Sequence, residues 1–155
     1  MGIKSFRGAQ AEQKKEYDAP ILVSDYMTKV KDLILFKPDH SVLEVMEVLI
    51  KKRISGGPVV DNTGKLVGMI SEGDCMKQVS ESRYFNMPMG DQTVEKYMYK
   101  NVQTIEWDQN IFDIARLFYD SKRRRFPVMQ DGKMVGQISR KDILKGALKL
   151  SGQSW

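Results

Sequence analysis

The chain repeats one eight-residue segment with five of its eight residues unchanged, and this repeat limits the fold more than any other feature. Residues 67–74 read Val-Gly-Met-Ile-Ser-Glu-Gly-Asp, and residues 135–142 read Val-Gly-Gln-Ile-Ser-Arg-Lys-Asp. An Asp nineteen residues before a Pro precedes each copy, as Asp39 and Pro58 and as Asp108 and Pro127. Such self-similarity predicts two copies of one supersecondary unit. Because polar residues recur together with apolar ones, we expect a repeated site as well as a repeated core.

Composition narrows the class of protein. The 155 residues suffice for one ordinary domain, and each repeat alone would be marginal, so we expect the two to share a core. No apolar run reaches the length of a membrane span, and the first residues lack the apolar block of a secretory signal. Cys75 is the only cysteine, which excludes an intrachain disulfide. These features favour a cytoplasmic protein.

The same order of elements is expected twice, as strand, helix, strand, strand, helix, which predicts an α+β fold. Ser41 and Glu44 form a capping box before one helix, and Asn110 caps its counterpart. Asp131-Gly132 is typical of a tight hairpin turn. The expected first strands are 33–36 and 102–105, and the last helices begin near Ser71 and at Arg140. The predicted divisions are a polar arm at 1–22, a first repeat at 23–80, an exposed linker at 81–93 and a second repeat at 94–150.

These residues resemble a tandem pair of CBS domains, known as the Bateman module. The resemblance rests on the order of elements, on Gly-Gly-Pro-Val-Val and Arg-Arg-Phe-Pro-Val, and on the doubled Gly-x-Ile-Ser-x-x-Asp. It implies two repeats packed about a pseudo-two-fold axis, with two clefts between them. It also implies a non-catalytic sensor that binds AMP, ADP, ATP, NAD or S-adenosylmethionine, forms a homodimer through its helices and reports ligand occupancy to an unknown regulated protein.

The repeated Ser and Asp have two readings. Ser71 with Asp74, and Ser139 with Asp142, fit a helix cap that needs no ligand. The same geometry exposes free N–H groups at a helix start, where phosphate binds readily, and a carboxylate there can accept hydrogen bonds from ribose hydroxyls. The family resemblance implies the second role. Since both copies keep both residues, we favour ligand contact.

The remaining site residues follow from the resemblance. Gly57, Pro58 and Val59 with Ile34 are implied to line one adenine pocket, and Pro127 and Val128 with Thr104 the other. Arg124 and Arg125 are implied to reach the nucleotide held by Ser71 and Asp74, since arginine forks bind phosphate bidentately. Their equivalents in the first repeat, Ser55 and Gly56, carry no charge. The Ser71 site is therefore expected to take the more phosphorylated ligand.

Two other functions stay open. The chain could be a structural or dimerisation module whose pockets are empty and whose Ser and Asp serve only as caps. It could bind nucleic acid through the basic run at 122–125 and the basic helix at 140–149, but the run lacks interleaved aromatic residues, and the net charge of +5 is small. No Ser-His-acid, Cys-His or paired-carboxylate arrangement can be assembled, so we do not expect an enzyme. One histidine and one cysteine give no metal site.

Overall fold

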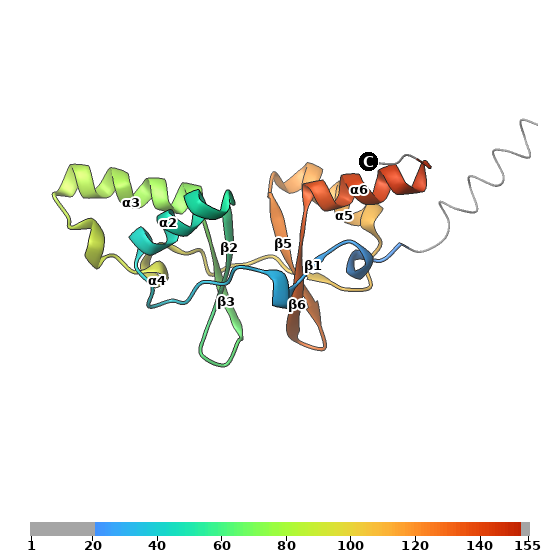
Figure 1. The fold of residues 1–155 in the computed structure, drawn as a ribbon, viewed down its shortest axis with the longest axis horizontal. Helices are drawn as coiled ribbons and strands as arrows, with labels where there is room; N and C mark the ends of the chain where they lie inside the picture. Colours follow the sequence, from blue (N-terminus) through green and yellow to red (C-terminus); the bar gives the residue numbers. More distant parts are fainter. Residues whose placement is uncertain (1–20, 153–155) are drawn as a thin grey trace, which may run out of the picture. The chain divides into compact units, whose positions relative to one another are not determined.

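The computed structural model describes residues 21–152, which form two compact units. Among these residues, unit 1 holds 21–28, 105–130 and 135–152, and unit 2 holds 29–104 and 131–134. Each unit combines a small sheet with helices, so the predicted α+β class is confirmed. In Figure 1, β2, β3, α2 and α3 mark unit 2, and β5, β6, α5 and α6 mark unit 1.

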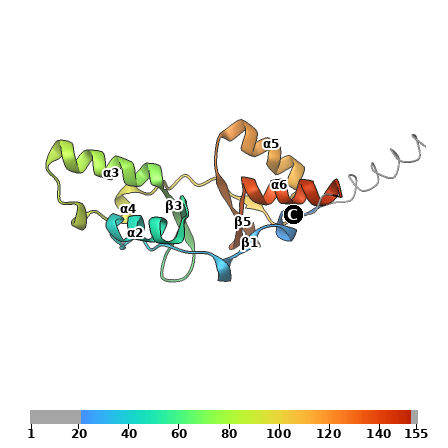
Figure 2. The same ribbon diagram turned by 45° about the horizontal axis from the view of Figure 1, so that its top comes forward.

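Unit 2 is built on the antiparallel hairpin of β2 (Gly56–Val60) and β3 (Leu66–Ser71). Helices α2 (Val42–Lys52) and α3 (Glu72–Phe85) lie on the same side of this hairpin in both ribbon views (Figures 1 and 2). The short helix α4 (Val94–Tyr97) follows α3. The Ser41 hydroxyl accepts a hydrogen bond from the Glu44 N–H at 3.1 Å, which is the first half of the predicted capping box.

Unit 1 has a four-stranded sheet in the order β1 (Thr28–Lys29), β6 (Lys133–Ser139), β5 (Arg125–Gln130), β4 (Ile105–Glu106). Helices α5 (Ile111–Ser121) and α6 (Arg140–Leu150) pack beside it. The Asn110 side chain accepts from the Phe112 N–H at 2.8 Å, so the predicted cap is confirmed. Asp131 and Gly132 have φ of 52° and 77°, as a tight hairpin turn requires.

The predicted strand at 33–36 is wrong in extent, because only Phe36 pairs. Its N–H donates to the Pro58 carbonyl and its carbonyl accepts from the Val60 N–H, both at 2.9 Å. The rest of this run is half-buried, and Ile34 packs against the core without joining a ladder. In unit 1, likewise, the expected strand at 102–105 is reduced to β4, which pairs in parallel with β5 at Ile105 and Val128.

Each unit is completed by the segment that precedes the other repeat in the sequence. Residues 21–28 pack in unit 1, where the Val23 N–H donates to the Gln109 carbonyl at 2.9 Å. Residues 92–99 pack in unit 2, where the corresponding Val94 N–H donates to the His40 carbonyl at 2.8 Å. The division into repeats at 23–80 and 94–150 stays a prediction about sequence units. The compact units of the fold have other boundaries than these repeats.

The glycine of the repeated segment makes this exchange possible. A Cβ built on Gly136 would lie 2.6 Å from the Thr28 carbonyl oxygen and 2.7 Å from Met27 Sδ. A Cβ built on Gly68 would lie 2.6 Å from Met98 Sδ and 3.0 Å from the Tyr99 carbonyl oxygen. Only a residue without a side chain lets the exchanged segment approach this closely.

In the two cores, an aromatic ring comes from different elements. In unit 2, a Cβ on Gly57 would lie 3.1 Å from the Phe36 ring, so this ring occupies the place of a side chain on β2. In unit 1, the residue equivalent to Gly57 is Phe126 on β5, so the ring belongs to this strand itself. Phe126 packs on Phe118 with ring centroids 4.6 Å apart. Gly57 thus has a packing role that needs no ligand.

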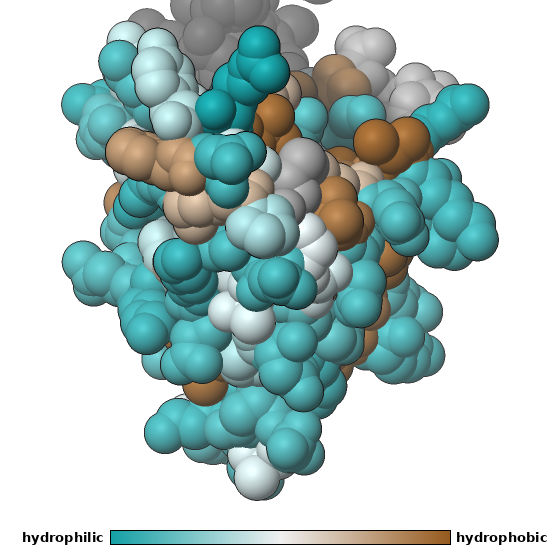
Figure 3. Space-filling view, turned by 90° about the vertical axis from the view of Figure 1, so that its left-hand side faces the viewer, coloured by the Kyte–Doolittle hydropathy of each residue, from teal (hydrophilic) through white to brown (hydrophobic). Residues whose placement is uncertain are grey.

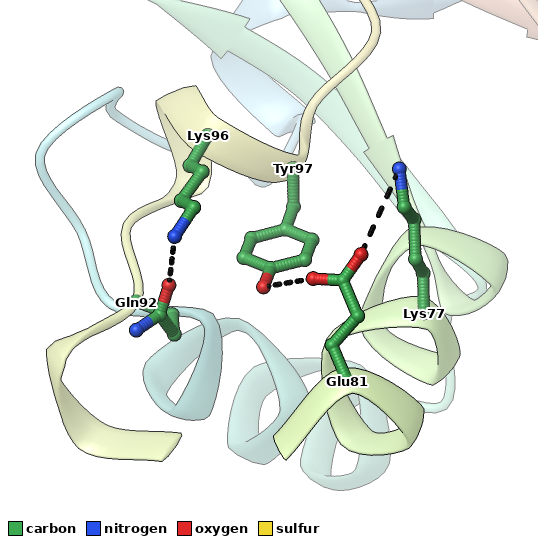
Figure 4. A network of polar contacts seen from close by, with 5 residues as sticks. All are labelled: Lys77, Glu81, Gln92, Lys96 and Tyr97. Atoms are coloured by element: carbon green, nitrogen blue, oxygen red, sulfur yellow. Dashed lines mark hydrogen bonds and ion pairs between the residues drawn. The ribbon is translucent and has the colours of Figure 1, made fainter. Parts of the chain in front are cut away.

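The segment predicted as an exposed linker, 81–93, is mostly exposed, but it is also structured and packs in unit 2. Helix α3 continues to Phe85, and Gln92 is buried. Figure 4 shows the polar contacts that hold this region: the Tyr97 hydroxyl donates to Glu81 at 2.6 Å, and Lys96 donates to Gln92 at 2.8 Å. The Tyr97 hydrogen bond and partial burial raise the pKa of Tyr97 to about 12.

Replacing Gly136 by Ala should destabilise the protein by about 1–3 kcal/mol, because the new methyl group overlaps the Thr28 carbonyl. Urea unfolding measures this loss. Gly73→Ala is the matched control: its Cβ meets only Ser71 Oγ at 3.6 Å, and Ala favours a helix over Gly, so stability should hold or rise. Equal midpoints for Gly136→Ala and the parent protein would show that the close approach carries no constraint.

Cys75 should be inert in the folded protein. Burial, with smaller contributions from the charges of Asp74 and Glu72, raises the pKa of its thiol from 9.0 to about 11. Its contribution to stability is therefore full below pH 9 and declines as pH rises toward 11, because the unfolded chain releases the proton first. A chromogenic disulfide reagent at pH 8 should label Cys75 much faster in urea than in buffer. Equal labelling rates in the two conditions would contradict the buried, protonated thiol.

Candidate functional site

The repeated Ser and Asp form reciprocal capping boxes at the starts of α3 and α6. Asp74 Oδ2 accepts from the Ser71 N–H at 2.8 Å and from the Ser71 hydroxyl at 3.0 Å, and the Asp74 N–H donates to Ser71 Oγ at 3.5 Å. The three corresponding distances at Ser139 and Asp142 are 2.8, 2.9 and 3.3 Å. The structural reading of these residues is therefore confirmed.

The caps leave binding capacity unused. In both boxes the hydrogen bonds to the carboxylate end on Oδ2, so within the described part of the chain Oδ1 keeps its lone pairs for another donor. All four side chains are only half-buried, so they are accessible from outside the helix. Each box also lies where a strand ends and a helix begins, the position at which free backbone N–H groups and the helix dipole favour an anion.

In unit 2 the fold brings together most of the residues expected to form the first site. Gly56 at the start of β2 is paired with Ser71 at the end of β3, and the Glu72 N–H donates to the Ser55 carbonyl at 2.9 Å. Pro58 and Val59 are buried on β2 next to Phe36. The Ile34 carbonyl oxygen lies 3.1 Å from the position of a Cβ on Gly57, so Ile34 flanks the same strand.

In unit 1 the equivalent residues gather at the same end of the sheet. Arg125 begins β5, which neighbours β6, and β6 ends at Ser139. Pro127 and Val128 are buried on β5, whereas Thr104, just before β4, is exposed. The expected reach of Arg124 and Arg125 to Ser71 concerns the arrangement of the two units and stays a prediction.

Three charged residues in the first turns of these helices were not among the residues expected to contact a nucleotide. Glu72 follows Ser71, and Arg140 and Lys141 follow Ser139. The Arg140 Nε donates to the Arg123 carbonyl at 2.7 Å, which holds the arginine run beside the start of α6. The signal was present in the repeat itself: these are the positions at which the two copies differ most in charge.

Residues 21–152 contain neither a cluster of metal ligands nor a membrane-spanning helix. No group of three or more His, Cys, Asp or Glu side chains in this range could hold a metal ion. In the same range, every helix is too short or too polar to cross a lipid bilayer.

Comparison with known proteins agrees with the repeat. The family model described as CBS domain matches residues 23–81 and 94–149. The chain is 35% identical over 152 residues to the chloroplastic CBS domain-containing protein CBSX1 of Arabidopsis thaliana, and 28% identical over 158 residues to CBSX2 of the same plant. These matches cover 83% and 85% of this chain but 64% and 66% of the relatives, so the chain spans just under two thirds of their length.

Solved structures give the same result. The crystal structure of CBSX2 in complex with AMP is 31% identical with a TM-score of 0.74, and the match covers 84% of this chain and 98% of that one. The CBS domain pair of protein MJ0100, solved with 5′-methylthioadenosine and S-adenosylmethionine, is 29% identical with a TM-score of 0.69, covering 83% and 96%. The two sheets, the doubled capping boxes and these matches agree, and the chain belongs to the CBS domain family, with two CBS domains in tandem.

Proposed function

We propose that this protein is a non-catalytic regulatory module that binds adenosine-containing ligands at the starts of α3 and α6. The observation that carries the proposal is the doubled capping box, in which each Asp keeps one carboxylate oxygen outside the cap. Relatives of known structure support the ligand class, since one was solved with AMP and another with 5′-methylthioadenosine and S-adenosylmethionine. ADP, ATP and NAD belong to the same class.

The chemistry of recognition follows from the residues around each box. Oδ1 of Asp74 or Asp142 accepts hydrogen bonds from the two vicinal ribose hydroxyls, while Ser71 or Ser139 holds the carboxylate in place. The adenine ring lies against the apolar start of the neighbouring strand: Pro58 and Val59 with Ile34 in one site, Pro127 and Val128 with Thr104 in the other. A phosphate, where the ligand has one, lies near the first turn of the helix.

A regulatory role fits a chain that contains CBS domains over most of its length. Ligand binding would be reported to a partner protein, whose identity and pathway stay open. Because the curated relatives are longer than the matched part, their full activities are not transferred to this chain. The expected cytoplasmic location also stays a prediction, and both plant relatives are named chloroplastic.

Titration calorimetry with adenosine tests the proposal, because adenosine contains the base and ribose but no phosphate. The parent protein should bind it, and Asp74→Asn and Asp142→Asn should each weaken one site by about 1.5–3 kcal/mol, since each loses charge-assisted bonds to ribose. Asn keeps a carbonyl oxygen for the cap, so folding should persist. Asp61→Asn, in an exposed turn of unit 2, is the matched control. If the variant that combines Asp74→Asn with Asp142→Asn binds adenosine as the parent protein does, the assignment of the boxes is wrong.

A homodimer is the second part of the proposal, and exposed apolar side chains support it. Met76 on α3 and Leu144 on α6 occupy equivalent positions and are 68% and 63% exposed, and Ile50 and Tyr119 form a second such pair on α2 and α5. Figure 3 shows apolar surface in its upper part, at the level of α2 and α3, whereas the lower part around the hairpin turn is mostly hydrophilic. An apolar set that recurs in both repeats suits a two-fold interface with a second copy.

Light scattering at micromolar concentration should therefore give the mass of a dimer. Met76→Lys combined with Leu144→Lys should give a monomer, because two charges would be buried at the interface without partners. Tyr84→Lys is the control, since Tyr84 is 83% exposed but has no counterpart among the repeated apolar positions. A parent protein that is monomeric throughout this range would contradict the proposed interface.

A further inference from the structure

The starts of α3 and α6 are equivalent in the fold but opposite in charge. Around α6, unit 1 carries the run Arg123-Arg124-Arg125 and the first-turn residues Arg140 and Lys141, with Asp142 as the one acidic residue at these positions. At the equivalent positions around α3, unit 2 carries Ile54-Ser55-Gly56, then Glu72 and Gly73, with Asp74. Unit 1 thus has five cationic residues at these positions, whereas unit 2 has none and has one more carboxylate.

In unit 1, the fold brings the backbone of the arginine run next to Arg140 in the first turn of α6. The hydrogen bond from Arg140 Nε to the Arg123 carbonyl joins the first turn of α6 to the segment that enters β5. Because this bond uses Nε, the two terminal nitrogens of the Arg140 guanidinium can still donate to another acceptor within the described residues. Lys141 is the next residue along the helix and is exposed.

This charge difference has a direct consequence for ligands that share the adenosine group. A phosphate placed at the start of α6 meets the helix dipole and has the cationic side chains of Arg140 and Lys141 in the same first turn. A phosphate placed at the start of α3 meets the same dipole, but Glu72 and Gly73 stand at the positions of Arg140 and Lys141, so neither position supplies a cation. An adenosine derivative without phosphate needs no cation there.

We infer that the Ser139/Asp142 box is the phosphate-selective site, with Arg140 and Lys141 as its specificity-determining residues, and that the Ser71/Asp74 box takes adenosine derivatives without phosphate. The inference rests on the proposed function, because it assumes that adenosine binds at both boxes. It reverses the expectation from the sequence, which assigned the more phosphorylated ligand to Ser71 and Asp74. That expectation depended on the reach of Arg124 and Arg125 to the other repeat, whereas the present one uses contacts within unit 1.

The test compares ADP with adenosine by titration calorimetry. Arg140→Ala combined with Lys141→Ala should weaken ADP about tenfold or more and leave adenosine unchanged, because only the phosphates lose partners. Lys145→Ala combined with Lys149→Ala removes the same charge from the same helix, away from its start, and should change neither ligand. Raising the salt concentration should weaken ADP but not adenosine.

Two single-site proteins then decide which box holds the phosphates. Asp74→Asn leaves the Ser139/Asp142 box intact and should keep tight ADP binding, while Asp142→Asn should lose it. The opposite result, with ADP binding lost only in Asp74→Asn, would overturn the inference and support the sequence-based assignment. Loss of ADP and adenosine alike in the Arg140/Lys141 variant would also overturn it. If the parent protein binds no adenosine, the proposed function itself is wrong.

Discussion

The close approach of an exchanged segment to the glycine of each repeated motif is the contact on which the rest of the fold depends. Gly136 lets the backbone of Thr28 reach β6, and Gly68 does the same for Tyr99 at β3. In unit 1, this approach adds β1 to the sheet beside β6. In unit 2, Tyr99 forms a single bridge with Met69 of β3. Each contact covers a strand edge that would otherwise be open. They also set the position of the strand end from which α3 or α6 begins. The capping boxes are therefore placed by a steric condition several residues upstream of them.

The sequence predicts well whatever is decided locally. The helices could be predicted because caps such as Ser41 and Asn110, together with apolar spacing, depend on neighbours along the chain. The hairpin at Asp131-Gly132 followed from turn chemistry in the same way. The exchange of segments could not be predicted, since it depends on which residues far along the chain meet Gly68 and Gly136. The shortened strand at Phe36 was missed because a buried apolar run looks the same whether or not its backbone pairs.

The candidate site shows the same division. Ser71, Asp74, Ser139 and Asp142 were found because they recur, and recurrence is visible without a structure. Arg140 and Lys141 were predicted only as part of a basic helix and not as nucleotide contacts, because they do not recur in the first repeat. The roles of cap and ligand contact also turn out to be compatible. The cap uses one carboxylate oxygen, and the structural reading therefore does not compete with the functional one.

Because the chain is synthesised from its N-terminus, the exchange of segments affects the order in which the two units can fold. Apart from the turn at 131–134, unit 2 is one continuous stretch, 29–104, so it can fold while the second repeat is still being synthesised. Unit 1 is different, because its first strand residue, Thr28, must wait for β6 at 133–139. Closing so long a loop costs little more than closing a shorter one, about 0.6 kcal/mol for each doubling of length, but it slows folding. Unit 2 is thus expected to be complete first, and its folding shortens the loop that unit 1 must close.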